Sequence, residues 1–594
     1  MIGRSKQRLN SNRFKTGHKS QVIPGHVACG LFWFSAMLST LREQLKNHLE
    51  RSLKQKLPAM VDLPSVELDI PADKAHGEFS CNIALKSAKL LQKPPFFIAE
   101  EFSAVVSQAL PFNAELREKI DRIEVKKPGF INFFLTPKAL YEIISEIFKE
   151  GNNYGRSKHG QDKMVQVEFV SANPTGPLSV AHARQAAVGD ALANILNFIG
   201  FKASREYYIN DGGNQINLLG ESIKCRAIEL LGGTAELPEN GYQGEYVRGM
   251  AQEFIAQNKI KILTDINKQD PASFKNYGVD HLLAVIRKDL EDFNVHFDCW
   301  THETKVATKE SINAILDLLQ KKGFLYEKDS ALWFRSTDFG DDKDRVVRKS
   351  DGSYTYLLPD IVYHKNKYDR GFEKLINLWG PDHHGYIPRI KAAAQALGKN
   401  PDSLNVLIVQ LATIYREGKP VSMSTRRGEF ISLREVIDEV GVDAARFFFL
   451  MRHINAHLDF DLELAKKETP ENPVYYIQYA HARIHSINKK AEEAGLKQKE
   501  NNFFLLSAPA ELDLIKKLGS FPDMLFVCYH ELDPYALMQY LHELAMVFHK
   551  FYDQHRVISD DTNLSSERLA LANATKIVLA NGLRLLGLST PERM

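Results

Sequence analysis

The stretch Met164–Leu192, MVQVEFVSANPTGPLSVAHARQAAVGDAL, decides the fold. It opens with a short β-branched run, continues through residues rich in Pro and Gly, and then places apolar side chains at helical spacing up to Ile199. A strand, a tight loop and a helix in this order form the first half of a βαβ unit. The stretch therefore predicts a parallel sheet that binds ligands at the carboxyl ends of its strands.

The pattern on either side of this stretch predicts several domains in a chain of 594 residues. Upstream, Leu41–Gln55 has a helical pattern, and IEVKKPGFINFFL reads as strand, with Ile131, Phe133 and Leu135 alternating. Downstream, KLINLWG and LNVLIVQLATI are strand candidates, residues 213–320 are largely helical, and nearly every segment from Leu433 is helical. We expect a basic extension at 1–36, a first domain at 37–150, a catalytic domain at 160–432 and a helix bundle at 433–594, with a turn-rich linker at 150–163.

Composition limits the classes of function. The 76 basic and 74 acidic side chains leave a net charge of +2, so a nucleic acid would have to meet a local basic patch. Five dispersed cysteines without a C-x-x-C pair indicate a reducing, cytosolic chain. The basic N-terminal segment precedes an apolar run at 27–38 that is too short to span a membrane; it resembles either a disordered extension or a signal peptide.

His182 lies where the loop of the opening stretch becomes helix. Backbone N–H groups at a helix start and the helix dipole favour a phosphate there, and an imidazole can donate to charge that develops on it. A surface or core histidine is the alternative that this residue alone leaves open. The loop contains neither G-x-G-x-x-G nor G-x-x-x-x-G-K-[ST], so no dinucleotide fingerprint or Walker loop is present.

A second cationic stretch, EGKPVSMSTRRGEFISL (Glu417–Leu433), follows much later in the chain. Its Gly, Pro, Ser and Thr residues predict a mobile loop, and Lys419, Arg426 and Arg427 give it positive charge. A loop of this kind facing a phosphate site can stabilise a phosphoryl-transfer transition state. Taken alone, the stretch would be more typical of a solvated surface loop.

Together the two stretches resemble the HIGH and KMSKS signatures of class I aminoacyl-tRNA synthetases, here as SVAH (Ser179–His182) and SMSTR (Ser422–Arg426). Further stretches resemble bacterial arginyl-tRNA synthetases: VEFVSANPTGPL, YYINDGGNQI, NLWGPDHHGYIPR, GVDAARFFFLMR, YYIQYAHARI and LANGLRLLGLSTPERM. HGEFSCNIALKSAKLLQKPP with KKPGFINFFL resembles the additional domain of that family. The resemblance covers residues 38–594 and implies an α/β protein: a Rossmann-like class I catalytic core, an N-terminal α+β additional domain and a C-terminal all-α anticodon-binding helix bundle.

Two departures separate this chain from the family pattern. In the first signature Ser179 replaces a histidine and Ala181 replaces a glycine, and in the second signature serine and threonine replace both lysines. A lysine that often precedes the first signature in such members is Gly176 here. We therefore expect Arg426 to supply the transition-state cation, with Arg427 or Lys419 as alternatives.

The resemblance implies a set of site residues. Ser171 and Asn173 would hold the amino and carboxylate ends of arginine, and Tyr356 and Asp360 would line the guanidinium side. Glu168, at the predicted strand end, is a further substrate position, because carboxylates best accept the hydrogen bonds of the planar guanidinium with its five N–H donors. The alternative for Glu168 is an exposed acid at the end of a strand. The residues implied for catalysis are His182, Ser179 and Arg426, and those for ATP are Pro177, Ala181, His182, Asp382, His383, Met423, Ser424 and Arg426.

Contacts with tRNA are expected in both outer domains. Aromatic and basic residues alternate in the C-terminal helices, where stacking faces beside cations suit unpaired bases, although most of the aromatic side chains at helical spacing belong to the core. The tRNA candidates are Asn132, Phe134, Arg483, Lys550 and Arg556. PDHHG could suggest a metal site, but two adjacent histidines point apart on most backbones, so we expect no protein-bound metal.

The sequence thus predicts a cytosolic, monomeric arginine–tRNA ligase that uses ATP with Mg²⁺, binds L-arginine and tRNA(Arg), does not bind a membrane, and requires tRNA for arginine activation. The altered signatures leave open a catalytically silent tRNA-binding paralogue. A ligase for another amino acid is disfavoured, because Glu168 and Asp360 would then be unpaired buried charges.

Overall fold

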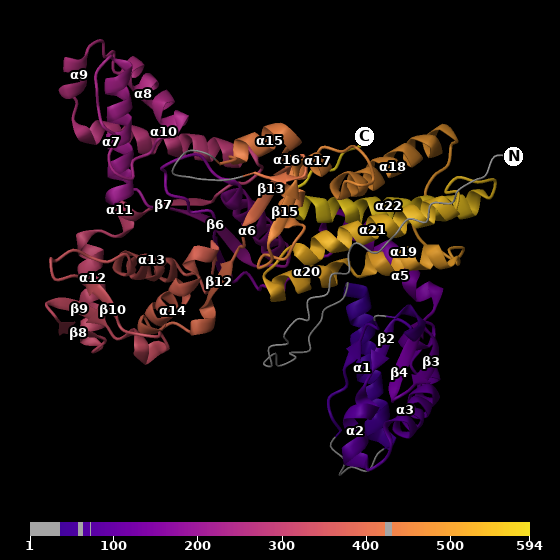
Figure 1. The fold of residues 1–594 in the computed structure, drawn as a ribbon. Coiled ribbons are helices and arrows are strands. Elements are labelled where there is room, and N and C mark those ends of the chain that lie inside the picture. The colour runs from indigo at the N-terminus through magenta and orange to yellow at the C-terminus, as the bar shows by residue number, and fades with distance from the viewer. Residues whose placement is uncertain (1–35, 57–62, 72, 422–429) are drawn as a thin grey trace. The chain divides into compact units, whose positions relative to one another are not determined.

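A five-stranded parallel sheet forms the centre of the catalytic region (Figure 1). The computed structural model describes residues 36–56, 63–71, 73–421 and 430–594, so the predicted basic extension lies almost wholly outside the described residues. The strand order is β12-β11-β5-β6-β7, in which β5 (Met164–Glu168) is central. Its partners are β6 (Lys202–Ile209), β7 (Cys299–His302), β11 (Lys374–Trp379) and β12 (Leu404–Ile408). Because the chain order reverses between β5 and β11, the crevice beyond their carboxyl ends is the expected ligand site.

Helix α6 (Val180–Phe198) follows β5, which confirms the strand, loop and helix predicted for the opening stretch. Almost every α6 side chain from Ala183 onward is buried, since the helix packs between the sheet and later helices. Gly189 makes this approach possible: a Cβ there would lie 2.2 Å from the ring of Phe169. The helix that carries His182 at its start is therefore held closely against the strand that precedes it.

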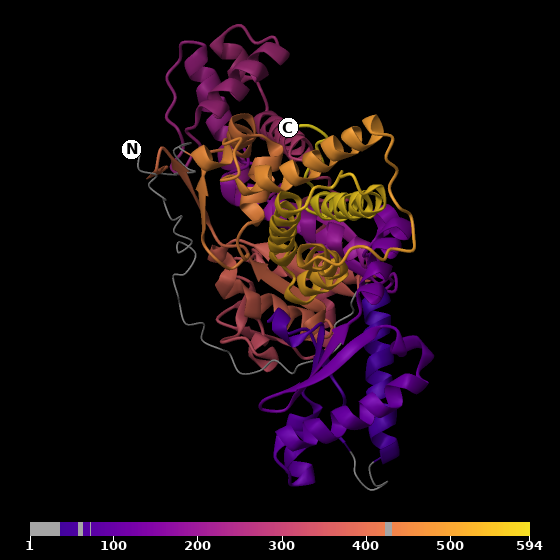
Figure 2. The ribbon, with the colours of Figure 1, turned by 90° about the vertical axis from the view of Figure 1, so that its right-hand side faces the viewer.

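The N-terminal region contains an antiparallel sheet of order β1-β2-β4-β3 (Figure 2). Its strands are β1 (Leu68–Asp69), β2 (Phe79–Cys81), β3 (Ile120–Lys126) and β4 (Phe130–Leu135). Its helices are α1 (Ala36–Lys56), α2 (Ile83–Leu91), α3 (Pro95–Ala109), α4 (Ala114–Arg117) and α5 (Pro137–Glu150). Ile131, Phe133 and Leu135 are buried, as their alternation predicts.

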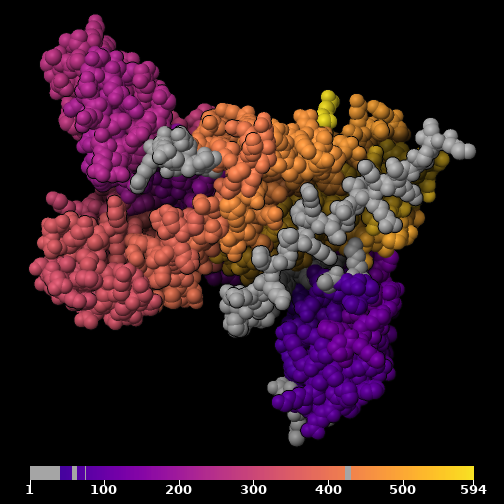
Figure 3. Space-filling model, in the orientation of Figure 1, coloured from indigo at the N-terminus to yellow at the C-terminus, as the bar shows by residue number. Residues whose placement is uncertain are grey.

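Between β6 and β7 the chain forms four helices with a core of their own, the magenta group at the upper left of Figure 3. They are α7 (Gly213–Leu230), α8 (Glu245–Gln257), α9 (Leu263–Asn267) and α10 (Pro271–Asp292). The prediction of a largely helical segment at 213–320 is confirmed in the main, with α11 (Glu303–Val306) and α12 (Lys309–Lys321) completing it. It missed β7, whose four residues are too few to give a clear alternation.

A second core lies under β8 (Leu325–Lys328), β9 (Ala331–Phe334) and β10 (Arg345–Arg348), which form an antiparallel sheet, with α13 (Leu357–Asp369) and α14 (Ile387–Ala396). The predicted strand KLINLWG is β11. The run LNVLIVQLATI is two strands in different sheets, since β13 (Ala412–Arg416) pairs with β14 (Lys419–Pro420) and with β15 (Leu458–Asp461).

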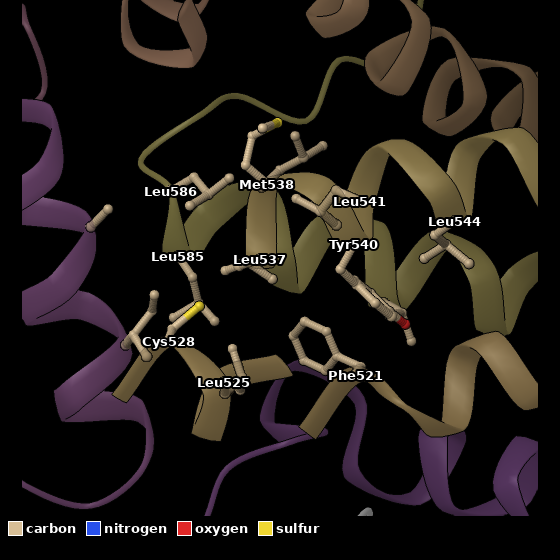
Figure 4. Close-up of a cluster of buried hydrophobic side chains, with 14 of the residues drawn as sticks. Phe521, Leu525, Cys528, Leu537, Met538, Tyr540, Leu541, Leu544, Leu585 and Leu586 are labelled. Atoms are coloured by element: carbon tan, nitrogen blue, oxygen red, sulfur yellow. The ribbon is translucent and has the colours of Figure 1, made fainter. Parts of the chain in front are cut away.

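The C-terminal region is helical, as its pattern predicts, apart from β15. Helices α15 (Leu433–Val440) and α16 (Val442–Leu450) precede that strand in the chain, and α17 (Leu462–Ala465) follows it. They precede α18 (Pro473–Glu493), α19 (Pro509–Gly519), α20 (Phe521–Glu531), α21 (Tyr535–Gln554) and α22 (Thr562–Leu585). Figure 4 shows Phe521, Leu525, Leu537, Leu541 and Leu585 packed together between α20, α21 and α22. Among the described residues, no helix is both long and apolar enough to cross a bilayer.

Candidate active site

The imidazole of His182 is fixed by the residue that caps its helix. Ser179 is the N-cap of α6, its backbone N–H donates to Nδ1 of His182 at 3.2 Å, and its hydroxyl oxygen also lies 3.2 Å from Nδ1. Burial lowers the pKa of His182 to about 4, and the negative charge of Asp382 opposes this shift. The ring is therefore neutral at pH 7, and because Nδ1 is the acceptor, Nε2 carries the proton. His182 thus offers one N–H donor at the start of a helix, while Ser179 braces it.

The residues that follow the second signature pair with the backbone of the first signature. Ser179 and Ser432 form an antiparallel bridge, the N–H of Val180 donates to the carbonyl of Ile431 at 3.3 Å, and the N–H of Leu433 donates to the carbonyl of Leu178 at 2.7 Å. The predicted residues Ser422, Met423, Ser424, Thr425, Arg426 and Arg427 lie outside the described residues. Lys419, in β14, is exposed. The backbone pairing nevertheless anchors the end of the cationic loop beside His182.

The other residues implied for ATP lie around the same edge of the sheet. Pro177 and Ala181 are half-buried on either side of Ser179. Asp382 and His383 are exposed in the short 3-10 helix Pro381–Tyr386 that follows β11, and His383 Nε2 lies 3.6 Å from Asp382 Oδ2. Among the described residues, no three His, Cys, Asp or Glu side chains are grouped as metal ligands.

Glu168 is neither exposed nor unpaired. It ends β5 with 6% of its surface exposed, and its carboxylate forms an ion pair with the fully buried Lys367 of α13. Lys367 also donates to the side-chain oxygen of Asn377 at 3.2 Å. The alternative of an exposed strand-end acid is therefore wrong. The argument against a neutral substrate is also wrong for Glu168, because Lys367 already compensates its charge.

The loop after β5 is strained where the substrate residues lie. Val170 and Ser171 have positive φ angles of 66° and 40°, which cost a non-glycine residue about 1–3 kcal/mol each. The Ser171 hydroxyl donates to Glu168 at 3.3 Å and accepts from the N–H of Tyr208 at 3.1 Å. The side-chain amide of Asn173 donates to Gln215 at 2.6 Å. These bonds join the loop to β6 and to the start of α7.

Two further carboxylates face this loop without a cation. Tyr386 donates to Asp360 at 2.5 Å, and Tyr208 donates to Glu303, the first residue of α11, at 2.8 Å. In the described part of the chain, no Lys or Arg nitrogen forms an ion pair with either carboxylate. Burial raises the pKa of Asp360 to about 7, helped by Glu303 and Glu168 and opposed by Tyr386 and Lys367. Burial also raises the pKa of Glu303.

Sequence reasoning missed Glu303, Lys367, Tyr208 and Tyr386. A signal existed for Lys367, which lies seven residues after Asp360 on the same face of α13. Glu303 follows β7, the strand that the sequence pattern did not reveal. By contrast, the predicted residue Tyr356 is 71% exposed at the start of α13.

The tRNA candidates differ in accessibility. The Arg483 guanidinium lies 4.5 Å from the ring centre of Tyr479 and 4.7 Å from that of Tyr552, so it joins α18 to α21 as part of a half-exposed aromatic cluster. Lys550 and Arg556 are exposed. In the N-terminal sheet, Phe134 lies under the Arg122 guanidinium at 3.7 Å. Asn132 is only 2% exposed and accepts from the Ser80 hydroxyl at 2.7 Å, so as it lies it offers no contact surface.

The fold and this arrangement define a class I tRNA synthetase: the family model "tRNA synthetases class I (R), catalytic domain" matches residues 143–455. The model "Arginyl tRNA synthetase N terminal domain" matches residues 42–135, and "DALR anticodon binding domain" matches residues 477–594. The chain belongs to the arginyl-tRNA synthetase family.

Relatives and solved structures agree with this placement. The chain is 45% identical to arginine–tRNA ligase 1 of Halalkalibacterium halodurans over 560 residues, which cover 94% of this chain and 100% of the relative. It is also 45% identical to the arginine–tRNA ligase of Bacillus subtilis, covering 94% of this chain and 99% of the relative. The Thermus thermophilus arginyl-tRNA synthetase structure has the same fold, with a TM-score of 0.69 and 22% identity over 93% of this chain and 100% of that one.

Proposed function

We propose that this chain forms arginyl-adenylate from L-arginine and ATP and then transfers the arginyl group to the 3′-terminal adenosine of tRNA(Arg). The observation that carries the proposal is the pair Asp360 and Glu303, two carboxylates at the carboxyl edge of the sheet that have no cation among the described residues. Both residues are half-buried, and two neighbouring carboxylates of this kind are stabilised by a shared cation. A guanidinium meets two carboxylates with its planar set of N–H donors.

The remaining substrate residues hold the other end of arginine. Asp360 and Glu303 receive the guanidinium, and Ser171 and Asn173, which lie in the strained loop, orient the amino and carboxylate groups. Glu168 keeps Ser171 in place and is itself balanced by Lys367. Tyr356 reaches the guanidinium side by turning in from the surface when arginine binds.

ATP binds across the start of α6 with Mg²⁺ as part of the substrate complex. The arginine carboxylate attacks the α-phosphate, pyrophosphate leaves, and the Nε2–H of His182 donates to the oxygen on which charge develops. The second signature supplies the cation through Arg426, with Arg427 and Lys419 as alternatives, and Met423 and Ser424 contact the nucleotide. The pairing of Ser432 with Ser179 supports this approach of the loop. Pro177, Ala181, Asp382 and His383 surround the nucleotide.

The outer domains bind tRNA. Helix α18 presents Arg483 beside the rings of Tyr479 and Tyr552, α21 presents Lys550, and Arg556 follows the end of α21. Cations beside aromatic rings suit unpaired anticodon bases. Phe134 and the surface around it contact a tRNA loop in the N-terminal domain. We place the enzyme in the cytoplasm as a monomer.

The test is charging of total tRNA by the purified protein with ATP and Mg²⁺, offering each labelled amino acid in turn. ATP–pyrophosphate exchange is measured in parallel, with and without tRNA. The proposal expects esterification of arginine alone and exchange only when tRNA is present. Binding of tRNA without any charging would instead identify a silent paralogue, the function that the altered signatures Ser179 and SMSTR favour.

A further inference from the structure

Each unpaired carboxylate of the arginine pocket is held by one tyrosine. The Tyr386 hydroxyl donates to Oδ2 of Asp360, and the Tyr208 hydroxyl donates to Oε2 of Glu303. Among the described residues, neither Oδ1 of Asp360 nor Oε1 of Glu303 has a hydrogen-bond partner. Both residues are half-buried, and these two oxygens keep contact with solvent. One oxygen of each carboxylate is thus directed by a phenol, and the other is open.

Both phenols are fixed by the scaffold. The Tyr208 ring stacks on the Tyr363 ring with centres 4.2 Å apart, and the Tyr363 hydroxyl donates to the fully buried Glu206 at 2.8 Å. Tyr386 follows β11, and its ring lies 6.0 Å from that of Trp379, with the Arg389 guanidinium 5.4 Å away. Because these contacts hold the rings, the two hydroxyls point at the carboxylates before any substrate arrives.

We propose that Tyr208 and Tyr386 are specificity-determining residues, which turn the open oxygens of Glu303 and Asp360 toward the guanidinium of arginine and keep both carboxylates ionised. The inference rests on the proposed function, in which these two carboxylates receive that group. An O–H donor favours the charged form of a carboxylate and occupies one of its oxygens. The pocket then presents acceptors only, which suits a planar fork of N–H donors better than an ammonium group or a neutral ureido group.

The surrounding charges make the phenols necessary. Asp360 faces Glu303 and Glu168, which resist its ionisation, while only Lys367 and Tyr386 favour it. Glu303 faces Asp211, which also resists ionisation, and Tyr208 is the group that favours it. Lys367 is already engaged by Glu168, so the two hydroxyls are the remaining groups that stabilise the negative charges of Asp360 and Glu303.

The experiment compares Tyr386→Phe and Tyr208→Phe with the matched control Tyr326→Phe. Tyr326 also donates to a carboxylate, Asp344 at 3.0 Å, but it lies in the small antiparallel sheet away from the pocket. For each variant, kcat and the KM values for arginine and ATP are measured in aminoacylation from about pH 6 to about pH 9. At pH 7 we expect the arginine KM to rise about tenfold for each pocket variant, with kcat and the ATP KM little changed.

The pH profile distinguishes this role from simple packing. Removing the hydroxyl should move the pH at which the arginine KM falls toward higher values, so that much of the loss recovers at about pH 9. A rise in KM that is equal at all pH values, or no rise at all, would overturn the proposal. An unchanged ATP KM shows that each variant folds. Asp360→Asn is a separate arm: if it binds arginine normally, the proposed site assignment fails, whereas impairment of Asp360→Asn alone leaves that assignment intact and refutes the role of the phenols.

Discussion

Two clusters of charged side chains in this molecule differ in whether the protein itself supplies every ionic partner. The guanidinium of Arg446 is fully buried, and it forms an ion pair with Asp190 at 2.6 Å and donates to the carbonyl of Leu586. It also donates to the Phe293 and Asn294 carbonyls, so α6, α10, α16 and the end of α22 meet around it. In the proposed arginine site, by contrast, Asp360 and Glu303 each accept a hydrogen bond from one phenol and form no ion pair with a described Lys or Arg.

This difference distinguishes charged groups that stabilise the fold from charged groups that can bind a substrate. A charge that the chain satisfies holds elements together, because losing one partner leaves the other buried and unpaired. A charged group without an ionic partner in the protein lowers the stability of the protein alone, and a substrate of opposite charge can supply that partner. The proposed site contains both situations, because Glu168 forms an ion pair with Lys367, whereas the nearby Asp360 and Glu303 form none with a described Lys or Arg.

The largest effect is expected at the completed cluster. Arg446→Leu removes the ion pair with Asp190 and several hydrogen bonds to carbonyls, which should lower the free energy of unfolding by about 3–5 kcal/mol. Denaturation by urea measures this change. The control is Lys138→Leu, which breaks an exposed ion pair with Glu118 and should change stability by at most about 1 kcal/mol. Equal stability of the two variants would contradict a structural role for the Arg446 cluster.

The next effect concerns chemistry rather than stability. His182→Ala removes the Nε2–H that we propose donates to the α-phosphate, so kcat should fall by about 10²–10³-fold while the arginine KM changes little. Steady-state aminoacylation separates the two constants. His296→Ala, at an exposed histidine, is the control and should keep full activity. A change confined to KM would show that His182 contributes to binding and not to the transition state.

A smaller effect is expected from pH. In the proposed site arginine binds the ionised form of Asp360, and burial raises the pKa of that carboxyl to about 7. We therefore expect kcat/KM for arginine to fall by about tenfold for each pH unit below about 7 and to level off above it. Measurements must be made at low arginine concentration, where binding limits the rate. In Asp360→Asn this pH dependence should be lost. A wild-type profile that is flat between about pH 6 and about pH 8 would contradict an uncompensated carboxyl at this position.

The smallest effect on stability is expected at a buried carboxylate that has no hydrogen-bond partner although it lies outside the active site. Asp523 of α20 is 4% exposed, neither of its oxygens has a hydrogen-bond partner, and it lies outside the active site. Burial raises the pKa of Asp523 to about 8, opposed by Arg42. Because the folded state retains a proton that the unfolded state loses above about pH 4, stability should decline as pH rises toward about 8.

Asp523→Asn should therefore raise stability by about 1 kcal/mol at pH 8 and by less at pH 5. Thermal melts at the two pH values measure the difference. A variant that is less stable than the wild type at pH 8 would show that the Asp523 carboxylate forms a needed interaction with Arg42, and the cluster would then count among the completed ones.

The features that depend on short stretches of sequence could be predicted from the sequence. The unit from β5 to α6, the place of His182 and the helical C-terminal region follow from periodicity and loop composition over short stretches. The predictions that failed concern side chains whose partners are distant in the sequence. Nothing in the pattern near Glu168 shows that Lys367 will reach it, and Glu303 was hidden because β7 has only four residues. Asn132 was selected by resemblance, but its side chain is turned toward Ser80.

We propose that Asp360 and Glu303 bind the guanidinium of arginine. Aminoacylation kinetics of Asp360→Asn and Glu303→Gln test this proposal most directly. The control is Asp344→Asn, a carboxylate that likewise accepts from a tyrosine hydroxyl. The account predicts that the arginine KM rises at least about 30-fold in both pocket variants, with the ATP KM and the control unchanged. Normal arginine KM values in both pocket variants would contradict it.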